Sequence, residues 1–198
     1  MENLIFATGN EHKASEVRKI LYDAPYNILT LSDIGYQEDI AETGDTFAEN
    51  ASIKAKTIYE TTSRNVFADD SGLEVWSLDM APGIYTARYA GDQKNDDDNI
   101  DKLLDALKGV DDRRARFVAV MAVIIDGQLE TFEGIVNGTI ADQRMGEGGF
   151  GYDPIFIPEG YDQSFAQLDD GVKNLISHRY HALYKMGKHL QESKKGQR

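Results

Sequence analysis

The stretch that most constrains this fold is residues 65–75, which read NVFADDSGLEV. A short apolar run leads to two adjacent carboxylates, Asp69 and Asp70, and apolar residues resume after a serine and a glycine. This pattern predicts a buried strand with both acids at its carboxyl end, and a sharp reversal at Gly72 into the next strand. Adjacent strand residues point to opposite faces, so the two acids should play different roles. The alternative is that Asp-Asp-Ser-Gly is simply a turn, because these residues favour turns.

Length and charge limit the classes of protein to consider. With 198 residues, the chain fits one domain with a substantial core, which leaves room for two lobes around a cleft. The net charge of -13 repels nucleic-acid backbones and anionic membranes, so we expect neither as a partner. The absence of cysteine excludes disulfides, thiolate catalysis and cysteine-ligated metals.

The beginning of the chain predicts a cytoplasmic location. Residues 1–6 contain an early acid and lack the basic region of a signal peptide. No apolar run is long enough to cross a bilayer.

A phosphate-binding turn is predicted near the start. Residues 4–7 form an apolar run typical of a buried strand, and Thr8-Gly9-Asn10 follows. Asn10 is a good helix N-cap, and apolar residues then recur at helical spacing. Lys13 lies in the first helical turn, where backbone N–H groups and the helix dipole favour an anion. The spacing is not that of a P-loop, and any strand-to-helix turn can carry this pattern.

The next segment supplies a further acid. Residues 26–31 predict a strand, and the polar connection 32–45 contains Glu42. A helix should follow, with an apolar stripe of Phe47, Ala51, Ala55 and Ile58. We interpret Lys54 and Lys56 on this helix as part of its solvated face.

The middle of the chain predicts structure rather than chemistry. The acids at 96–98 resemble a metal cluster, but a helix start is favoured because leucines follow at helical spacing. Residues 116–125 and 129–140 are predicted strands, and Asp126-Gly127 between them is a strong hairpin signal.

Two later segments carry candidate base-binding residues. Glycines around Phe150 and Tyr152 let the backbone approach a ligand, and the two rings can stack on a base, although a glycine-rich hairpin corner would look the same. A helix should span residues 173–192, and the alternative is that Ser177 interrupts it and caps a new helix that opens with His178 and Arg179. These two side chains offer hydrogen-bond donors for carbonyl oxygens.

Five stretches together resemble one family, the non-canonical purine nucleoside-triphosphate pyrophosphatases, which include the inosine-triphosphatase and Ham1-like enzymes. Each motif alone is weak, but the ordered set is specific and spans residues 4 to about 190. The stretches are ATGN-x-x-K at 7–13, FADDSGL at 67–73, APGIY-x-ARY at 81–89, GGFGYDP at 148–154 and KN-x-x-SHR at 173–179.

The resemblance implies a single α/β domain over residues 1–198, with two lobes, a curved mixed sheet and a central nucleotide-binding cleft. It also implies Mg²⁺ and a homodimer. Asp70 would be the general base and a metal ligand, with Asp69 beside it and Glu42 as second ligand. Lys13, a further catalytic residue, would hold the triphosphate together with Thr8 and Asn10. Here Ala41 precedes Glu42, where many members carry two consecutive acids, so the second ligand is left open. The remaining implied substrate-binding residues are Thr8, Gly9, Asn10, Ser71, Phe150, Gly151, Tyr152, Asp153, Lys173, His178 and Arg179.

The residue chemistry suits the implied reaction, the hydrolysis of ITP, dITP or XTP to a monophosphate and pyrophosphate. Carboxylates can hold Mg²⁺ and accept a proton from water, and Lys13 can neutralise the leaving group. Donors from His178 and Arg179 favour a 6-oxo purine over adenine. Two other hypotheses stay open: a pyrophosphatase for modified pyrimidine or canonical nucleotides, and a non-catalytic nucleotide sensor.

Overall fold

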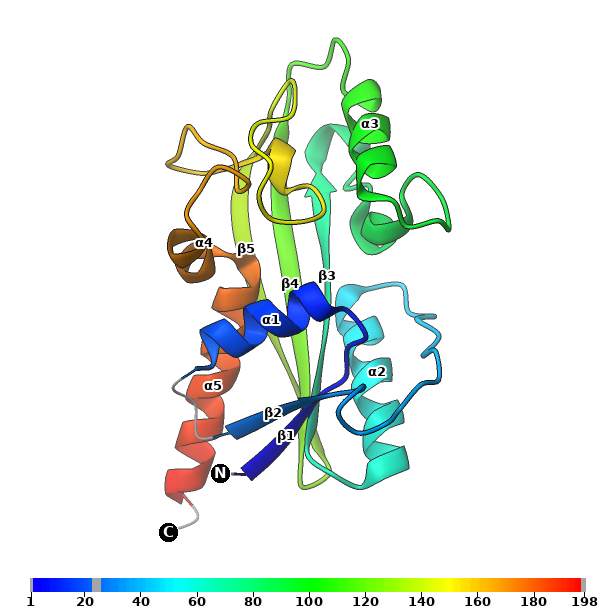
Figure 1. Ribbon diagram of the computed structural model, residues 1–198, viewed down its shortest axis with the longest axis vertical. Helices are drawn as coiled ribbons and strands as arrows, with labels where there is room; N and C mark the ends of the chain where they lie inside the picture. The colour runs from blue at the N-terminus through cyan, green and yellow to red at the C-terminus, as the bar shows by residue number, and fades with distance from the viewer. Residues whose placement is uncertain (1, 23–25, 197–198) are drawn as a thin grey trace. The chain divides into compact units, whose positions relative to one another are not determined.

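The protein is an α/β protein built on one mixed sheet of six strands, as a computed structural model shows (Figure 1). The structure describes residues 2–22 and 26–196, with side chains as far as residue 192. The strand order is β2-β1-β3-β4-β5-β6. The strands are β1 Glu2–Phe6, β2 Tyr26–Thr30, β3 Val66–Val75, β4 Arg114–Ile125, β5 Gln128–Ile140 and β6 Phe156–Pro158.

The helices alternate with these strands along the first half of the chain. β1 pairs in parallel with both β2 and β3, which requires crossover helices, whereas β5 and β6 are antiparallel. The α-helices are α1 Glu11–Ile20, α2 Phe47–Thr62, α3 Asp96–Ala106, α4 Asp170–Ile176 and α5 His178–Gly196. Short 3₁₀ turns occupy Trp76–Leu78, Gly83–Arg88 and Asp153–Ile155.

The chain divides into two compact units. The first comprises residues 1–70, 119–134 and 179–198, and the second comprises 71–118 and 135–178. Each unit has a core of its own, so each is described by itself.

The core of the first unit joins β1 to α1 and α5. Phe6 and Phe67 stack with their ring centroids 4.5 Å apart, at the point where β1 pairs with β3. Figure 1 shows β1 and β2 side by side, as their register from Glu2 opposite Tyr26 requires. The other buried members come mainly from helices and from β4: Leu4, Ala14, Val17, Ala119, Met121, Val123, Ala182, Leu183, Met186 and Leu190. This packing fixes where α1 begins, and α1 carries Lys13.

The core of the second unit lies between α3 and one face of β3–β6. Phe117, Phe156 and Phe165 form a cluster of rings with centroids 4.6–6.1 Å apart. The rest of this core is Leu73, Val75, Ile100, Leu103, Leu107, Ala115, Ile140, Tyr152 and Ile155. Alternate strand residues, such as Glu74, point away from this core, because strand side chains alternate between faces.

Several predicted local structures are confirmed. Asn10 caps α1 by accepting a hydrogen bond from the Lys13 N–H, and Asn95 caps α3 in the same way from Asp98, so the acids at 96–98 open a helix. Asp126 and Gly127 both have positive φ, as a tight hairpin turn requires. Ser177 adopts an extended conformation between α4 and α5.

The reversal predicted at Gly72 is wrong. Residues 66–75 form one continuous strand, so Asp69 and Asp70 lie in the middle of β3 rather than at its end. Glycine permits a reversal without imposing one, and the apolar residues on both sides of the acids are all buried in β3. The separation of the two carboxylates onto opposite faces does hold, and it shapes the site.

Candidate active site

The turn from β1 into α1 is organised by short hydrogen bonds. The Asn10 N–H donates to the Thr8 hydroxyl at 3.1 Å, and the Lys13 N–H donates to the Asn10 side-chain oxygen at 3.1 Å. These bonds fix the direction in which the positive end of α1 points. The sequence predicted the turn at Thr8-Gly9-Asn10, the N-cap at Asn10 and the place of Lys13 in the first helical turn, but not the bond from Asn10 to Thr8.

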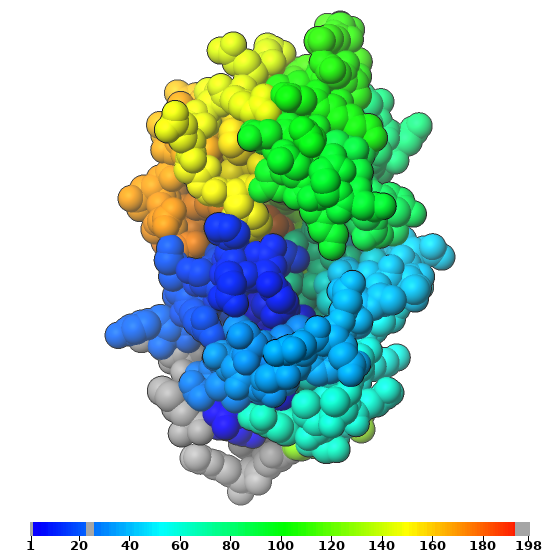
Figure 2. Space-filling model, turned by 45° about the vertical axis from the view of Figure 1, so that its right-hand side comes forward, coloured from blue at the N-terminus to red at the C-terminus, as the bar shows by residue number. Residues whose placement is uncertain are grey.

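A hollow of about 380 Å³ adjoins this turn within the first unit. Thr8, Gly9 and Glu11 line one side, and residues 31–38 after β2 line the other. Figure 2 shows both segments at the surface, coloured dark blue and lighter blue. From the sequence, we predicted only a polar connection after β2, because the polar residues of this segment form no recognisable motif.

Asp69 is the centre of a buried ion-pair network. Its Oδ2 lies 3.1 Å from the Lys13 ammonium and 3.5 Å from Nε of Arg179, and Arg179 also pairs with Glu16. Burial alone raises the pKa of Asp69, but Lys13 and Arg179 outweigh burial and hold that pKa well below its usual range. Burial likewise lowers the pKa of Lys13, partly offset by Asp69. Asp69 is therefore a fixed negative charge that holds two cations in place.

Asp70 points the other way into a different environment. Its Oδ1 lies 3.8 Å from the ammonium of Lys54, which donates a hydrogen bond of 3.1 Å to Glu42. Burial raises the pKa of Asp70 to about 6, with Lys54 and Lys13 acting against that rise and Glu42 and Asp69 adding to it. Such a carboxylate can accept a proton near neutral pH.

The pair Glu42 and Asp70 has the donor chemistry that suits a hard divalent cation. Lys54 already bridges the two carboxylates, which shows that this place stabilises positive charge. Among the residues that the structure describes, there is no group of three or more metal-ligating side chains. Mg²⁺ commonly uses only one or two carboxylates and completes its shell with water and substrate phosphates, so the residues fit this ion.

The second unit holds the glycine-rich loop. The Asp153 carboxylate accepts a hydrogen bond from the Phe150 N–H at 2.8 Å and pairs with Lys173 at 2.6 Å, and both Asp153 and Lys173 are buried. The Lys173 ammonium lies 5.1 Å from the centre of the Phe150 ring. The N–H of Gly151 donates to Asp96 at 2.8 Å. The structure thus brings together predicted residues that are 20 positions apart in sequence.

Tyr152 and His178 are packed into the second unit. The Tyr152 hydroxyl donates to the Thr86 carbonyl at 2.9 Å, and burial raises its pKa. The His178 ring stacks on Phe117 at 4.8 Å. Ser71 is half-buried and follows Asp70 directly in β3.

For three residues of the candidate site, the structure differs from the sequence-based prediction or shows a role that was not predicted. Lys54 was assigned to a solvated face, yet its side chain is only 12% exposed beside Asp70. Its spacing of three and four from buried Ala51 and Ile58 was the available signal. Glu16 lies one turn after Lys13, and nothing marked it out. Arg179 is fully buried against Glu16 and Asp69, so its contact with a purine stays a prediction.

The fold and these side chains define a class of α/β protein. It combines a helix N-terminus of the kind that binds phosphate with buried carboxylates that pair with lysines. The chain belongs to the Ham1 family, whose sequence profile matches residues 4–189.

Individual relatives agree with this membership. A dITP/XTP pyrophosphatase of Christiangramia forsetii is 52% identical over 176 residues, which are 89% of this chain and 92% of that protein. The dITP/XTP pyrophosphatase of Bacillus subtilis is 47% identical over 194 residues, covering 96% of this chain and 98% of the relative. The Staphylococcus aureus Ham1 protein superposes with a TM-score of 0.88 at 41% identity, over 97% of this chain and all of that structure.

Proposed function

We propose that this protein is a hydrolase that converts the non-canonical purine nucleoside triphosphates ITP, dITP and XTP to monophosphate and pyrophosphate. The observation that carries the proposal is the contrast between two neighbouring acids: Asp69 is fixed as an anion by Lys13, and Asp70 is poised to exchange a proton. Relatives about half identical to this chain are dITP/XTP pyrophosphatases, which supports the same reaction here.

The chemical step follows from the residues of the first unit. Asp70 takes a proton from a water molecule whose oxygen bonds to the α-phosphorus, while the bond from that phosphorus to the bridging oxygen breaks. The leaving pyrophosphate is neutralised by Lys13 and by the first N–H groups of α1, next to Thr8, Gly9 and Asn10. Asp69 holds the Lys13 ammonium in position for this.

We propose Mg²⁺ as the cofactor, held by Asp70 and Glu42. The ion would supply charge neutralisation at the phosphate oxygens. The ammonium of Lys54, now shared by these two carboxylates, would then be available to a phosphate oxygen.

Residues of the second unit are proposed to recognise the nucleoside. Phe150 offers a ring face, and Lys173 and Asp153 hold the loop that carries it. Gly151, Tyr152 and Ser71 complete the sugar and base contacts, and His178 reads the 6-oxo group of the purine. Arg179, which belongs to the first unit, is proposed to read the same group. The arrangement of two lobes around one cleft stays a prediction of the family resemblance.

We also propose a homodimer, as the family resemblance implies, and a cytoplasmic location, as expected from the sequence. Within the described part of the chain, none of the helices has the length and apolar character needed to cross a membrane. The net charge of -13 disfavours polymeric nucleic acid as a partner.

The test is a product assay with Mg²⁺ and ITP, XTP, dITP, GTP, ATP and dTTP in separate reactions. Turnover of ITP, dITP and XTP far above GTP and ATP, with pyrophosphate released, would support the proposal. Orthophosphate as product, or a preference for dTTP, would overturn it. Tight binding without turnover would instead identify a sensor. An Asp70→Asn variant run in parallel tests the assignment of the base.

A further inference from the structure

The first turn of α3 contacts the glycine-rich loop, residues 148–153. The carboxylate of Asp96 accepts a hydrogen bond of 2.8 Å from the Gly151 N–H, and both residues belong to the second unit. A backbone N–H that donates to a carboxylate forms a stronger bond than one that donates to a neutral acceptor. The start of α3 therefore does more than begin a helix, because one of its acids holds a segment 55 positions further along the chain.

Two carboxylates hold consecutive N–H groups of this loop. The Phe150 N–H donates to Asp153 at 2.8 Å, and the Gly151 N–H donates to Asp96 at the same distance. Gly151 has a φ of +59°, a backbone conformation that glycine permits without imposing it. The position of the Phe150 ring therefore depends on these two bonds, since they fix the peptide groups on both sides of its Cα.

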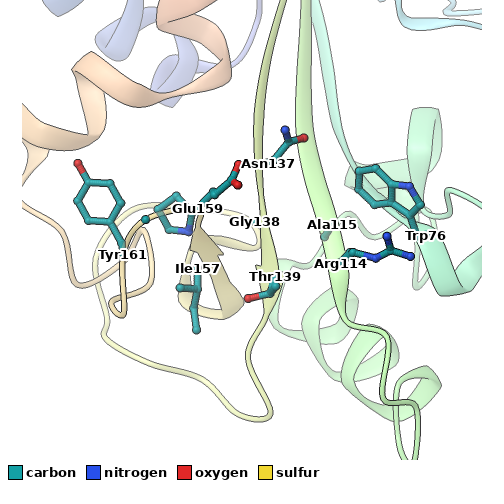
Figure 3. Close-up of a pocket in the computed structure, with 11 residues that line it drawn as sticks. Trp76, Arg114, Ala115, Asn137, Gly138, Thr139, Ile157, Glu159 and Tyr161 are labelled. Carbon is teal, nitrogen blue, oxygen red and sulfur yellow. The ribbon is translucent and has the colours of Figure 1, made fainter.

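The sheet fixes the end of the loop rather than its middle. After Asp153–Ile155 the chain enters β6, which pairs with β5 so that Ile157 lies opposite Thr139. Figure 3 shows these two side chains where both strands line a cavity of about 470 Å³. The Met145 N–H donates to the Pro154 carbonyl at 2.7 Å and closes the base of the loop. The loop residues between these two lie outside the sheet, so they need anchors of their own.

The start of α3 is a firm support for such an anchor. Asn99 in α3 is buried, and its side chain donates to the Ala87 carbonyl at 3.0 Å. The neighbouring carbonyl of Thr86 accepts the hydroxyl of Tyr152 at 2.9 Å. The helix thus supports the loop at a second point, through the APGIY-x-ARY stretch.

The other two acids of this helical turn have different partners. The Asp97 carboxylate pairs with Arg144 at 3.3 Å, and the Asp98 carboxylate accepts from the Gln93 side chain at 3.1 Å. All three acids lie in the first turn of α3, where the helix dipole favours negative charge. The effect on the dipole is therefore shared, whereas the bond to the loop comes from Asp96.

We propose that Asp96 is a positioning residue that fixes the glycine-rich loop in the conformation that receives the nucleoside. It acts through the Gly151 N–H and the Phe150 ring rather than on the reacting atoms. The inference rests on the proposed function, in which this loop contacts the base and sugar, and it adds a residue to that site. Because Asp96 is exposed whereas Asp153 and Lys173 are buried, removing its carboxylate should loosen the loop without opening the core.

The kinetic test compares Asp96→Ala with Asp98→Ala, which removes an equal charge from the same helical turn. Asp96→Ala should raise the KM for ITP about 5- to 20-fold and leave kcat within about twofold, because the lost bond serves binding rather than the chemical step. Asp98→Ala should match wild type in both constants. Asp96→Asn keeps a side-chain oxygen that can accept the Gly151 N–H, so its KM should return to within about threefold of wild type.

Amide hydrogen exchange measured by NMR reports on the loop without substrate. The Gly151 amide should exchange about tenfold faster in Asp96→Ala than in wild type, because its acceptor is lost. In Asp98→Ala it should exchange at the wild-type rate. Circular dichroism checks that each variant is folded. An Asp96→Ala protein that does not fold would overturn the proposal, since the core does not need an exposed loop anchor.

Three kinetic results would also overturn it. The first is an equal rise of KM in Asp96→Ala and Asp98→Ala, which would assign the effect to the helix dipole. The second is a fall in kcat at constant KM. The third is an Asp96→Asn protein as impaired as Asp96→Ala, which would make the charge responsible instead of the hydrogen bond.

The exchange measurement separates this inference from the proposed function. If wild type does not hydrolyse ITP, the proposed function fails, and the Gly151 amide decides about Asp96 by itself. Faster exchange in Asp96→Ala alone would support the anchor. Equal exchange in wild type and both alanine variants would refute it, whatever their activity.

Discussion

Asp69 and Asp70 are adjacent in the chain, yet their carboxylates face opposite electrostatic environments. Asp69 is neutralised by Lys13 at 3.1 Å and by Arg179 at 3.5 Å. Asp70 is buried with a pKa raised to about 6. The alternation of side chains along β3 produces this difference without any turn between the two residues.

Exchanging each acid for its amide should therefore have opposite effects on stability. Asp70→Asn removes a charge that burial destabilises, so we expect the variant to stabilise the metal-free protein at pH 7.5 by about 1–3 kcal/mol. Turnover of ITP should fall about 10²- to 10⁴-fold, because the general base is lost. Asp69→Asn should destabilise the fold by about 3–5 kcal/mol, since buried cations lose their partner. Thermal and urea unfolding measure both effects. A loss of stability in Asp70→Asn would contradict the conclusion that burial destabilises the charged carboxylate of Asp70.

The pH dependence of stability follows from the same carboxyl. The pKa of Asp70 is raised from 3.8 to about 6 in the folded protein, so between those values the folded state binds more protons than the unfolded state. Its stabilising contribution is complete below pH 4 and is lost as the pH rises through 6. In EDTA, wild type and Asp70→Asn should melt together near pH 4, and wild type should fall several degrees below the variant above pH 6. A gap that is constant across this range would rule out Asp70 as its source.

Magnesium should remove the difference in melting temperature between wild type and Asp70→Asn above pH 6. An ion that binds only the folded state at a hundred times its dissociation constant adds about 2.7 kcal/mol of stability. Because Asp70 and Glu42 are the proposed ligands, Mg²⁺ should raise the melting temperature of wild type and have little effect on Asp70→Asn or Glu42→Gln. Calorimetric titration provides an independent readout. Equal stabilisation of all three proteins would place the ion elsewhere.

The sequence predicted best where the chemistry is local. The N-cap at Asn10, the helix start at Asp96 and the turn at Asp126-Gly127 all depend on neighbouring residues, and all three are confirmed. The continuous strand through Gly72 depends on packing from other elements, which explains why the predicted reversal was wrong. A local pattern cannot show whether a permissive glycine is used.

The sequence offered candidate site residues but not the way in which they pair. The ordered motifs pointed to Lys13, Asp69, Asp70 and Arg179 as candidates, whose roles stay predictions, but not to the burial of Arg179 against Asp69 and Glu16. Such a pairing joins residues more than 100 positions apart, and no spacing rule encodes it. The helical spacing of Lys54 indicated that it is partly buried, but not that its partners come from the loop before α2 and from β3.

Lys54 can be tested against the lysine two positions further along α2. Lys54→Met leaves the carboxylates of Glu42 and Asp70 without their shared cation, so the pKa of Asp70 should rise further. The rise of kcat/KM with pH should move to higher pH, and turnover at pH 7 should fall about 10- to 100-fold. Lys56→Met is the control, because Lys56 is exposed on the same helix, and its profile should match wild type. If both variants behave alike, Lys54 belongs to the solvated face after all.

The glycine-rich loop makes a prediction about Gly149. Its φ is +74°, and a Cβ there would lie 2.1 Å from the carboxylate of Asp153, the group that holds Lys173 and the Phe150 N–H. Gly149→Ala should therefore cost about 1–3 kcal/mol and raise the KM for ITP, because the loop carrying Phe150 must shift. Gly187→Ala in α5 is the matched control: no atom lies within 4 Å of its new Cβ, and helix propensity predicts a gain of about 0.5–1 kcal/mol. Unfolding curves and initial rates for the two variants separate a loop effect from a general effect of the methyl group. A Gly149→Ala protein with wild-type stability and KM would show that the loop does not depend on this backbone conformation.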